Sequence, residues 1–188
     1  GVCLATSGPG ATNLVTGIAT AYMDSVPMVV ITGNVGKSLI GRDAFQEVYI
    51  TGITMPITKH NYMVQDVNEL ADTIREAFRI ANTGRKGPVL IDITKDVTAA
   101  VTEFEKKEKI VIKDDTVIDM DELQKVADII NKAKKPVVMF GGGVVSSNAS
   151  ELALELVEKA NIPSCHTLMS AGVIGYNNPL NLGLLGMH

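Results

Sequence analysis

The chain has 188 residues, a length that suits one large domain or two small ones. Hydrophobic residues make up 46% of it and charged residues 20%, which is an ordinary composition for a soluble globular protein. The formal net charge of -4 gives no electrostatic reason to expect a nucleic acid or an anionic membrane surface as a partner.

The two cysteines indicate the redox environment of the protein, and the two ends of the chain indicate whether it is part of a longer one. Cys3 and Cys165 are far apart in sequence and have no CxxC spacing, which indicates buried thiols in a reducing cytoplasm. No apolar run reaches the roughly 18 residues that a membrane-spanning helix requires. The first residues, GVCLAT, are typical of a buried strand, and the last, LLGMH, stop within an apolar pattern. Because domain ends are usually polar, we expect an internal piece of a longer protein.

Strands and helices alternate through the first hundred residues. Strands are expected at 1–6, 27–32, 56–64 and 88–93, with helices at 11–23 and 67–82 and a short helix at 44–53. The runs PMVVIT and PVLIDI show no polar alternation, which is typical of parallel strands covered on both faces. These elements predict a parallel sheet flanked by helices.

The composition changes after this first unit. Residues 101–118 are charged and have no helical apolar face, so they are expected to form a solvated linker. In the remainder, a helix at 120–133 capped by Asp119, a strand at 136–140, a helix at 147–161 and a strand at 162–166 are expected. We therefore predict an α/β protein with two domains, at residues 1–100 and 119–188.

Ligands of open parallel sheets bind beyond the carboxyl ends of the strands. The loops expected there are SGPG, GNVGKSLIGRDAFQE and TKD in the first domain, and GGG and TLMSAG in the second. The chain has neither GxGxxG nor a Walker lysine, and no ligand spacing that predicts a metal site. On its own, SGPG is more typical of a tight strand-to-helix turn, whereas GGG is open to either a turn or a ligand contact.

Four residues, in these loops or flanking a buried strand, have chemistry that a site could use. Lys95 follows a buried strand at its expected carboxyl end, where it could meet an anionic substrate or could be an ordinary surface lysine. Arg85 flanks the same strand on its other side. Phe45 and Gln46 pair an aromatic wall with an amide, which suits recognition of a small polar molecule.

In combination these segments are far more specific. SGPGATN, DSVPMVVITG, DAFQE, ITKHNYMV and GPVLIDITKDV, followed by KKPVVMFGGG, CHTLM and LLGMH, resemble in collinear order the large catalytic subunits of the acetolactate synthase family. The resemblance covers essentially the whole chain. It implies a thiamine-diphosphate-dependent transferase that decarboxylates pyruvate and joins it to a second 2-ketoacid, the first common step of branched-chain amino-acid biosynthesis. It also implies that residues 1–100 are the C-terminal part of a pyrimidine-binding domain. Residues 119–188 would be the N-terminal part of a Rossmann-like central domain associated with FAD.

The resemblance assigns roles to individual residues. Gln46, Phe45 and Lys95 are the implied catalytic residues, which face the substrate and the reactive carbon of the thiazolium ring. The implied contacts of the cofactor's aminopyrimidine are Gly8, Pro9 and Asn13. The implied FAD contacts are Arg85, Gly141, Gly142, Gly143, Thr167, Leu168, Met169, Gly186, Met187 and His188. The chain departs from the family pattern near the site, with GRD for GTD, GNV for GQV, TKD for PKD and RKG for RPG.

Other family features lie outside these residues. The glutamate that activates the aminopyrimidine and the motif that supplies the Mg²⁺ ligands are both absent, which implies that the 188 residues alone are inactive. The implied partners are pyruvate and 2-ketobutyrate, a second copy in a homodimer or homotetramer, and a small regulatory subunit. The alternatives are a thiamine-diphosphate enzyme of the glyoxylate carboligase or pyruvate oxidase type, or a non-catalytic FAD-binding or regulatory module.

Overall fold

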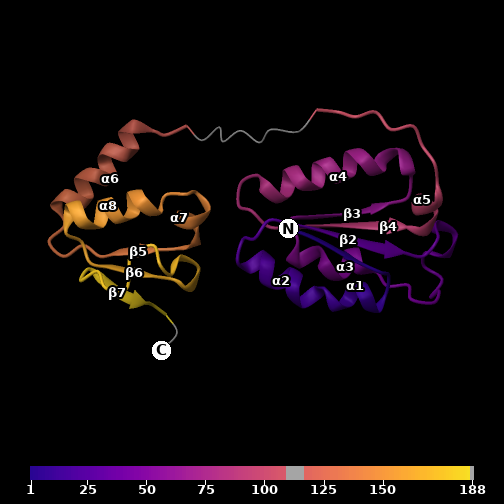
Figure 1. Ribbon diagram of the computed structural model, residues 1–188, viewed down its shortest axis with the longest axis horizontal. Coiled ribbons are helices and arrows are strands. Elements are labelled where there is room, and N and C mark those ends of the chain that lie inside the picture. The colour runs from indigo at the N-terminus through magenta and orange to yellow at the C-terminus, as the bar shows by residue number, and fades with distance from the viewer. Residues whose placement is uncertain (109–116, 187–188) are drawn as a thin grey trace. The chain divides into compact units, whose positions relative to one another are not determined.

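The computed structural model of the protein describes residues 1–108 and 117–186. The chain forms two compact units, Gly1–Asp114 and Asp115–His188, each with a sheet and flanking helices (Figure 1). Residues 109–116 of the predicted linker lie outside the described part. Within the described part, no helix is both long enough and apolar enough to cross a membrane.

The first unit is built on a four-stranded sheet. Its strands are β1 (Val2–Ala5), β2 (Met28–Asn34), β3 (His60–Val64) and β4 (Pro88–Thr94). They lie in the order β1-β2-β4-β3, and all three neighbouring pairs are parallel. The predicted parallel α/β architecture is confirmed.

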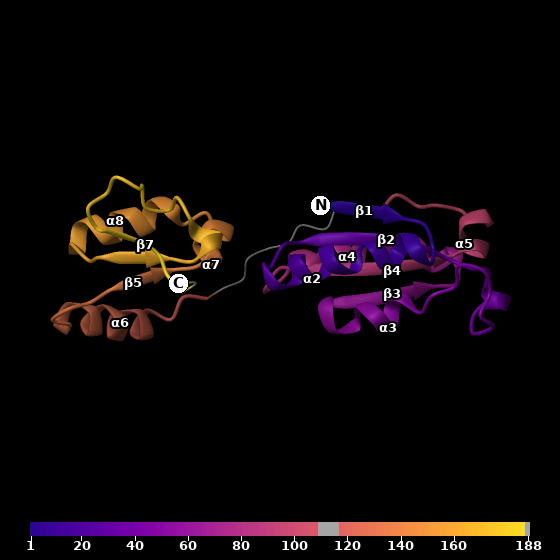
Figure 2. The ribbon, with the colours of Figure 1, turned by 90° about the horizontal axis from the view of Figure 1, so that it is seen from below.

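Helices cover both faces of this sheet (Figures 1 and 2). They are α1 (Pro9–Asn13), α2 (Val15–Met23), α3 (Ile50–Thr54), α4 (Val67–Asn82) and α5 (Lys95–Ala99), with 3-10 turns at Lys37–Leu39 and Met55–Ile57. The long helix α4 lies on one face, and α1, α2 and α3 lie on the other. Because these helices pack on the faces of the sheet, loops lie at the ends of its strands.

Alternating side chains of β2 and β4 form the core on each face. Val29 and Ile91 belong to an apolar cluster that includes Ala77 of α4. Their neighbours Val30 and Leu90 belong to the cluster with α1, α2 and α3. Successive strand residues point to opposite faces, so a strand covered on both faces needs apolar residues at consecutive positions. All seven residues of β4 are buried, as PVLIDI predicted.

The strand β1 differs from the expectation of a buried strand. Val2 is 58% exposed and Leu4 is 78% exposed, because β1 lies at the edge of the sheet and pairs only with β2. The apolar pattern of GVCLAT predicted the strand correctly but its burial wrongly. An apolar sequence pattern indicates that side chains favour burial. It does not show whether another part of the protein covers them.

Several predicted boundaries were also wrong in the first unit. The helix expected at 11–23 begins at Pro9, which suits the first turn of a helix, and it is interrupted at Leu14 between α1 and α2. Of the helix expected at 44–53, only the last part forms, as α3. Its first part includes Gln46, whose φ of 60° is incompatible with a right-handed helix. The strand expected at 56–64 begins only at His60.

The described start of the predicted linker runs along α4. The Thr102 hydroxyl donates to the Asn68 side chain over 2.7 Å, and Lys107 pairs with Asp72 at 2.7 Å. These side chains are exposed, so the contacts add little to stability. They nevertheless hold residues 102–107 against α4.

The second unit is a smaller α/β layer. Its strands are β5 (Val138–Phe140), β6 (Ser164–His166) and β7 (Asn181–Leu184), parallel and in the order β5-β6-β7. Its helices are α6 (Met120–Lys132), α7 (Gly142–Ser146) and α8 (Ser150–Ala160), with a 3-10 turn at Leu168–Ser170. Phe140 of β5 and Val157 of α8 lie in its apolar core. As predicted, the Asp119 side chain caps α6 by accepting from the amides of Asp121 and Glu122.

Two features of this unit were not expected. The GGG triplet is not an extended loop, because Gly141 is the N-cap of α7 and the next two glycines begin that helix. The helix that begins in GGG ends at Ser146, and a turn follows in which Asn148 has a φ of 56°. The helix expected at 147–161 therefore begins only at Ser150. The strand β7 was not predicted, since NLGL is short and contains a glycine of positive φ, Gly183.

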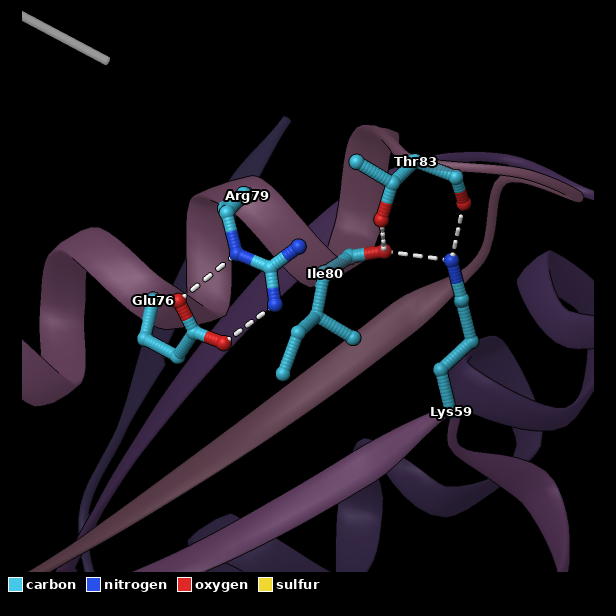
Figure 3. Close-up of polar contacts among 5 residues, drawn as sticks. All are labelled: Lys59, Glu76, Arg79, Ile80 and Thr83. Carbon is cyan, nitrogen blue, oxygen red and sulfur yellow. Dashed lines mark hydrogen bonds and ion pairs between the residues drawn. The ribbon is translucent and has the colours of Figure 1, made fainter. Parts of the chain in front are cut away.

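A lysine closes the carboxyl end of α4 (Figure 3). The Lys59 ammonium donates to the carbonyls of Ile80 and Thr83, the latter over 2.6 Å. In the same last turn, Arg79 donates two hydrogen bonds of 2.8 and 2.5 Å to Glu76. The last carbonyls of a helix have no partners within it, so a half-buried cation there satisfies them and complements the helix dipole. Burial, together with the charge of Arg79, lowers the pKa of Lys59.

We expect Lys59→Met to lower the free energy of unfolding by about 1–2 kcal/mol, because two carbonyls lose a charged donor. Chemical denaturation of the 188-residue chain measures the effect, with the exposed Lys106→Met as the control that removes a lysine without removing a cap. Equal stability of the two variants would contradict the capping role.

Candidate functional site

The carboxyl ends of the four strands of the first unit meet at one edge of its sheet. Figure 1 shows the strand arrows pointing toward the end where α5 lies. Three segments named from the sequence follow these ends: the turn at Gly8 after β1, the loop 35–49 after β2, and Lys95 after β4. This edge is the place where open parallel sheets bind ligands.

The turn after β1 touches the turn that contains Gln46. Gly8 has φ 60° and ψ -116°, a conformation that only glycine adopts readily. A Cβ atom at Gly8 would lie 2.7 Å from the backbone oxygen of Gln46 and 3.0 Å from its Cα. Gly33, near the end of β2, lies close to the backbone nitrogen of Ser7, at 3.6 Å from its ideal Cβ position. Gly8 therefore lets the turn after β1 approach the turn that contains Gln46, whereas the contact at Gly33 is of ordinary length.

A buried acid lies beneath these loops. Asp92 is fully buried in β4, where one carboxylate oxygen accepts a hydrogen bond from the Thr32 hydroxyl over 2.8 Å. The other oxygen accepts from the Asn34 amide over 2.5 Å. The Asn34 side-chain oxygen in turn accepts from the Val35 amide over 2.8 Å, at the start of the loop. Burial raises the pKa of Asp92 to about 6, against the opposing effect of the hydrogen bonds from Thr32 and Asn34.

A second acid joins the loop after β2 to α5. The Asp96 carboxylate accepts a hydrogen bond from the Lys37 amide, and it lies 3.3 Å from the ideal Cβ position of Gly36. Asp96 directly follows Lys95 in the first turn of α5. The loop after β2 and the Lys95 segment are thus fixed to each other.

Three exposed side chains at this edge offer three different kinds of contact to a ligand. Phe45 is 88% exposed, and Gln46 and Lys95 are exposed as well. They offer an aromatic ring for a flat heterocycle, an amide for a carbonyl or hydroxyl, and an ammonium for a carboxylate. Such groups can together contact a small polar ligand. Within residues 1–108 and 117–186, no three His, Cys, Asp or Glu side chains are grouped as metal ligands.

Two predicted cofactor contacts of the first unit lie away from these loops. Asn13 is exposed at the end of α1 and lines a cavity of about 150 Å³ with residues of β1, α2 and β2. Arg85 precedes β4 and so lies at the opposite end of that strand from Lys95. Its guanidinium donates to the Ser25 hydroxyl over 2.8 Å and to the Met23 carbonyl over 3.2 Å. The structure therefore does not group Asn13 or Arg85 with Gln46. Pro9, in contrast, directly follows Gly8 as the first residue of α1.

The predicted FAD residues of the second unit come from the ends of β5 and β6. An ideal Cβ at Gly142 would lie 3.0 Å from the Cβ of Met169, so the two loops are in contact. The Thr167 amide donates to the Phe140 carbonyl over 2.9 Å. Leu168, beside Met169, is 75% exposed. Gly141 and Gly143 flank Gly142 in the same segment, and Gly186 follows β7 with a φ of 112°. The predictions for Met187 and His188 lie outside the described residues.

Sequence reasoning missed two polar residues of the first site. Asp92 was taken as part of the buried strand PVLIDI, although an acid among apolar residues is itself an indication of a special role. Glu47 was given no role beyond its place in the motif DAFQE. Its carboxylate instead accepts hydrogen bonds from the backbone amides of Gly41 and Ala44, the latter over 3.0 Å.

Comparison with known proteins defines the class to which this geometry belongs. Residues 1–53 match the family model described as "Thiamine pyrophosphate enzyme, N-terminal TPP binding domain". Residues 123–188 match "Thiamine pyrophosphate enzyme, central domain". The two matches have the same order along the chain as the two units. The chain therefore belongs to the thiamine pyrophosphate enzyme family.

Comparison with individual curated proteins identifies members of this family to which the chain is similar. The chain is 52% identical to the acetolactate synthase isozyme 1 large subunit of Escherichia coli, over all of its own length and 33% of the relative's. It is 50% identical to a probable acetolactate synthase large subunit of Methanococcus aeolicus, covering 32% of that protein. It is 49% identical to the acetolactate synthase large subunit of Corynebacterium glutamicum, covering 30%. The chain thus spans about a third of the length of these relatives.

Proposed function

We propose that the full-length protein carrying this chain is an acetolactate synthase. Its reaction decarboxylates pyruvate and joins the remaining two-carbon unit to a second 2-ketoacid, the first common step of branched-chain amino-acid biosynthesis. The observation that carries the proposal is the similarity of about 50% identity along the entire chain to large subunits of that enzyme. The grouping of the DAFQE and TKD segments at one sheet edge supports it.

The chain's own residues would bind and orient the reactants. Thiamine diphosphate, when bound, stabilises the negative charge that is left as pyruvate loses carbon dioxide. Gln46 would donate a hydrogen bond from its amide to an oxygen of the ketoacid and fix its orientation. Phe45 would exclude water from the reacting carbon, and Lys95 would hold the ketoacid's carboxylate.

Further components belong to this proposal. Mg²⁺ would be bound by residues outside these 188, together with the diphosphate of the cofactor. FAD would lie at the strand ends of the second unit, where no atom lies within 4 Å of the ideal Cβ positions of Gly141 and Gly143, which leaves space beside the backbone for a flat ligand. The acceptor would be pyruvate or 2-ketobutyrate, and the assembly a homodimer or homotetramer in the cytoplasm with a small regulatory subunit.

The Gln46→Ala substitution in a full-length subunit tests the proposal. We expect kcat/KM for pyruvate to fall roughly 100-fold, because an orienting contact to the ketoacid is lost. Acetolactate formation from pyruvate, thiamine diphosphate and Mg²⁺ measures it. The exposed glutamine of α6 provides the matched control, Gln124→Ala, which should leave the rate unchanged.

Two outcomes would contradict the proposal in different ways. Unchanged kinetics in Gln46→Ala with both pyruvate and 2-ketobutyrate would remove Gln46 from the site. Condensation of glyoxylate without acetolactate formation by the unaltered subunit would assign a different thiamine-diphosphate enzyme.

A further inference from the structure

The turn that presents Phe45 and Gln46 is strained. The Glu47 amide donates to the Ala44 carbonyl over 2.9 Å, so Phe45 and Gln46 are the two central residues of a β-turn. Gln46 has a φ of 60°, which glycine or asparagine usually supplies at the third position of a turn. An ordinary side chain in this region persists only where its surroundings hold it there.

The Glu47 side chain is part of these surroundings. One carboxylate oxygen accepts from the Ala44 amide over 3.0 Å, and the other accepts from the Gly41 amide. Glu47 therefore binds both backbone polar groups of Ala44, one through its own amide and one through its side chain. The Gly41 and Ala44 amides lower the pKa of Glu47, which keeps its carboxylate ionised as an acceptor.

The other contacts of this loop give Gln46 a fixed place once the turn is closed. At the start of the loop, Asp92 holds Asn34 and Asp96 holds the Lys37 amide. At its end, the Gln46 backbone lies against Gly8. Between these anchors, Glu47 is the residue whose side chain ties residues 41–44 to the turn.

We propose that Glu47 is a positioning residue that holds Gln46 at the site edge by bracing the Ala44–Glu47 turn. The inference rests on the proposed function and deepens it. Each carboxylate oxygen of Glu47 accepts from a backbone amide of the loop, so Glu47 acts on the turn and through it on Gln46. The family motif DAFQE thus contains the residue that orients its own glutamine.

The first test is made on the 188-residue chain and does not depend on activity. Glu47→Gln replaces one acceptor oxygen by a donor, which cannot bind an amide N–H. We expect at least one of the two amides, Gly41 or Ala44, to exchange with deuterium about tenfold faster or more, while the denaturation midpoint stays the same. Glu69→Gln, at an exposed glutamate of α4, is the control and should leave both amides unchanged. Unaltered exchange in Glu47→Gln overturns the inference.

The second test is a double-mutant cycle in the full-length subunit. Glu47→Gln should lower kcat for acetolactate formation roughly tenfold, and should add almost nothing to the loss already caused by Gln46→Ala. Additive losses, or an unchanged kcat, would show that Glu47 does not act through Gln46. Absence of acetolactate formation by the unaltered subunit would overturn the proposed function and the catalytic part of this inference together. The exchange result distinguishes the two failures, because it concerns the turn alone.

Discussion

The Gly8→Ala substitution is expected to lower kcat/KM of the full-length protein by about 100-fold or more, because a displacement of about 1 Å at a site can have an effect of that size. A methyl group at Gly8 would lie 2.7 Å from the Gln46 carbonyl oxygen, well inside normal contact. Backbone is on both sides of this contact, so one of the two turns has to move. The φ of 60° at Gly8 adds backbone strain of about 1–3 kcal/mol for any other residue.

Gly17→Ala is the matched control for this prediction. Gly17 lies within α2, its φ is not positive, and its ideal Cβ position has no neighbour within 4 Å. Alanine there should raise the free energy of unfolding by about 0.5–1 kcal/mol, since glycine is unfavourable inside a helix. Denaturation of both variants and kinetics of both full-length proteins make the comparison. If Gly8→Ala were as stable and as active as Gly17→Ala, the close contact of the two turns would be wrong.

The buried acid Asp92 is expected to make stability depend on pH in an unusual direction. Burial raises its pKa in the folded chain to about 6, from the ordinary value of 3.8. The folded state therefore binds the proton more tightly than the unfolded state does. Its contribution to stability is fully present below about pH 4 and decreases as the pH rises to about 6, by about 2–3 kcal/mol in total.

Comparison with Asp92→Asn isolates this effect. Several other carboxylates, among them Glu47, Asp72 and Glu76, have lowered pKa values and act in the opposite direction. The informative quantity is thus the difference in unfolding free energy between the unaltered chain and Asp92→Asn, measured by urea denaturation from pH 4 to 7. We expect this difference to shift in favour of Asp92→Asn as the pH rises. A flat difference, or one of opposite slope, would contradict the burial of a titrating Asp92.

The strands and the site edge could be predicted from the sequence, because both depend on local pattern. Consecutive apolar residues in PMVVIT and PVLIDI predicted two-sided burial, and β2 and β4 are the two inner strands of the first sheet. Alternation of strands and helices then predicted parallel pairing, which places the strand-end loops together. The resemblance to acetolactate synthases added the residue roles, which geometry alone could not supply.

What failed depends on contacts between distant segments. The exposure of β1 follows from its position at the sheet edge, which no pattern within GVCLAT encodes. The positive φ of Gln46 excludes the first part of the helix predicted at 44–53, and the Gln46 backbone lies against Gly8, which is distant in the sequence. The pairing of Asn34 with Asp92 joins two strands that are far apart in sequence. It also gives the unusual asparagine of GNV a structural role.

The central claim is that the strand-end loops of the first unit form one wall of a thiamine diphosphate site. Amide hydrogen exchange of a full-length subunit, with and without thiamine diphosphate, Mg²⁺ and pyruvate, tests it most directly. We predict that protection in the first unit will concentrate at residues 7–10, 35–47 and 95–96. Unchanged exchange at all three segments, with protection elsewhere in the first unit, would contradict the account.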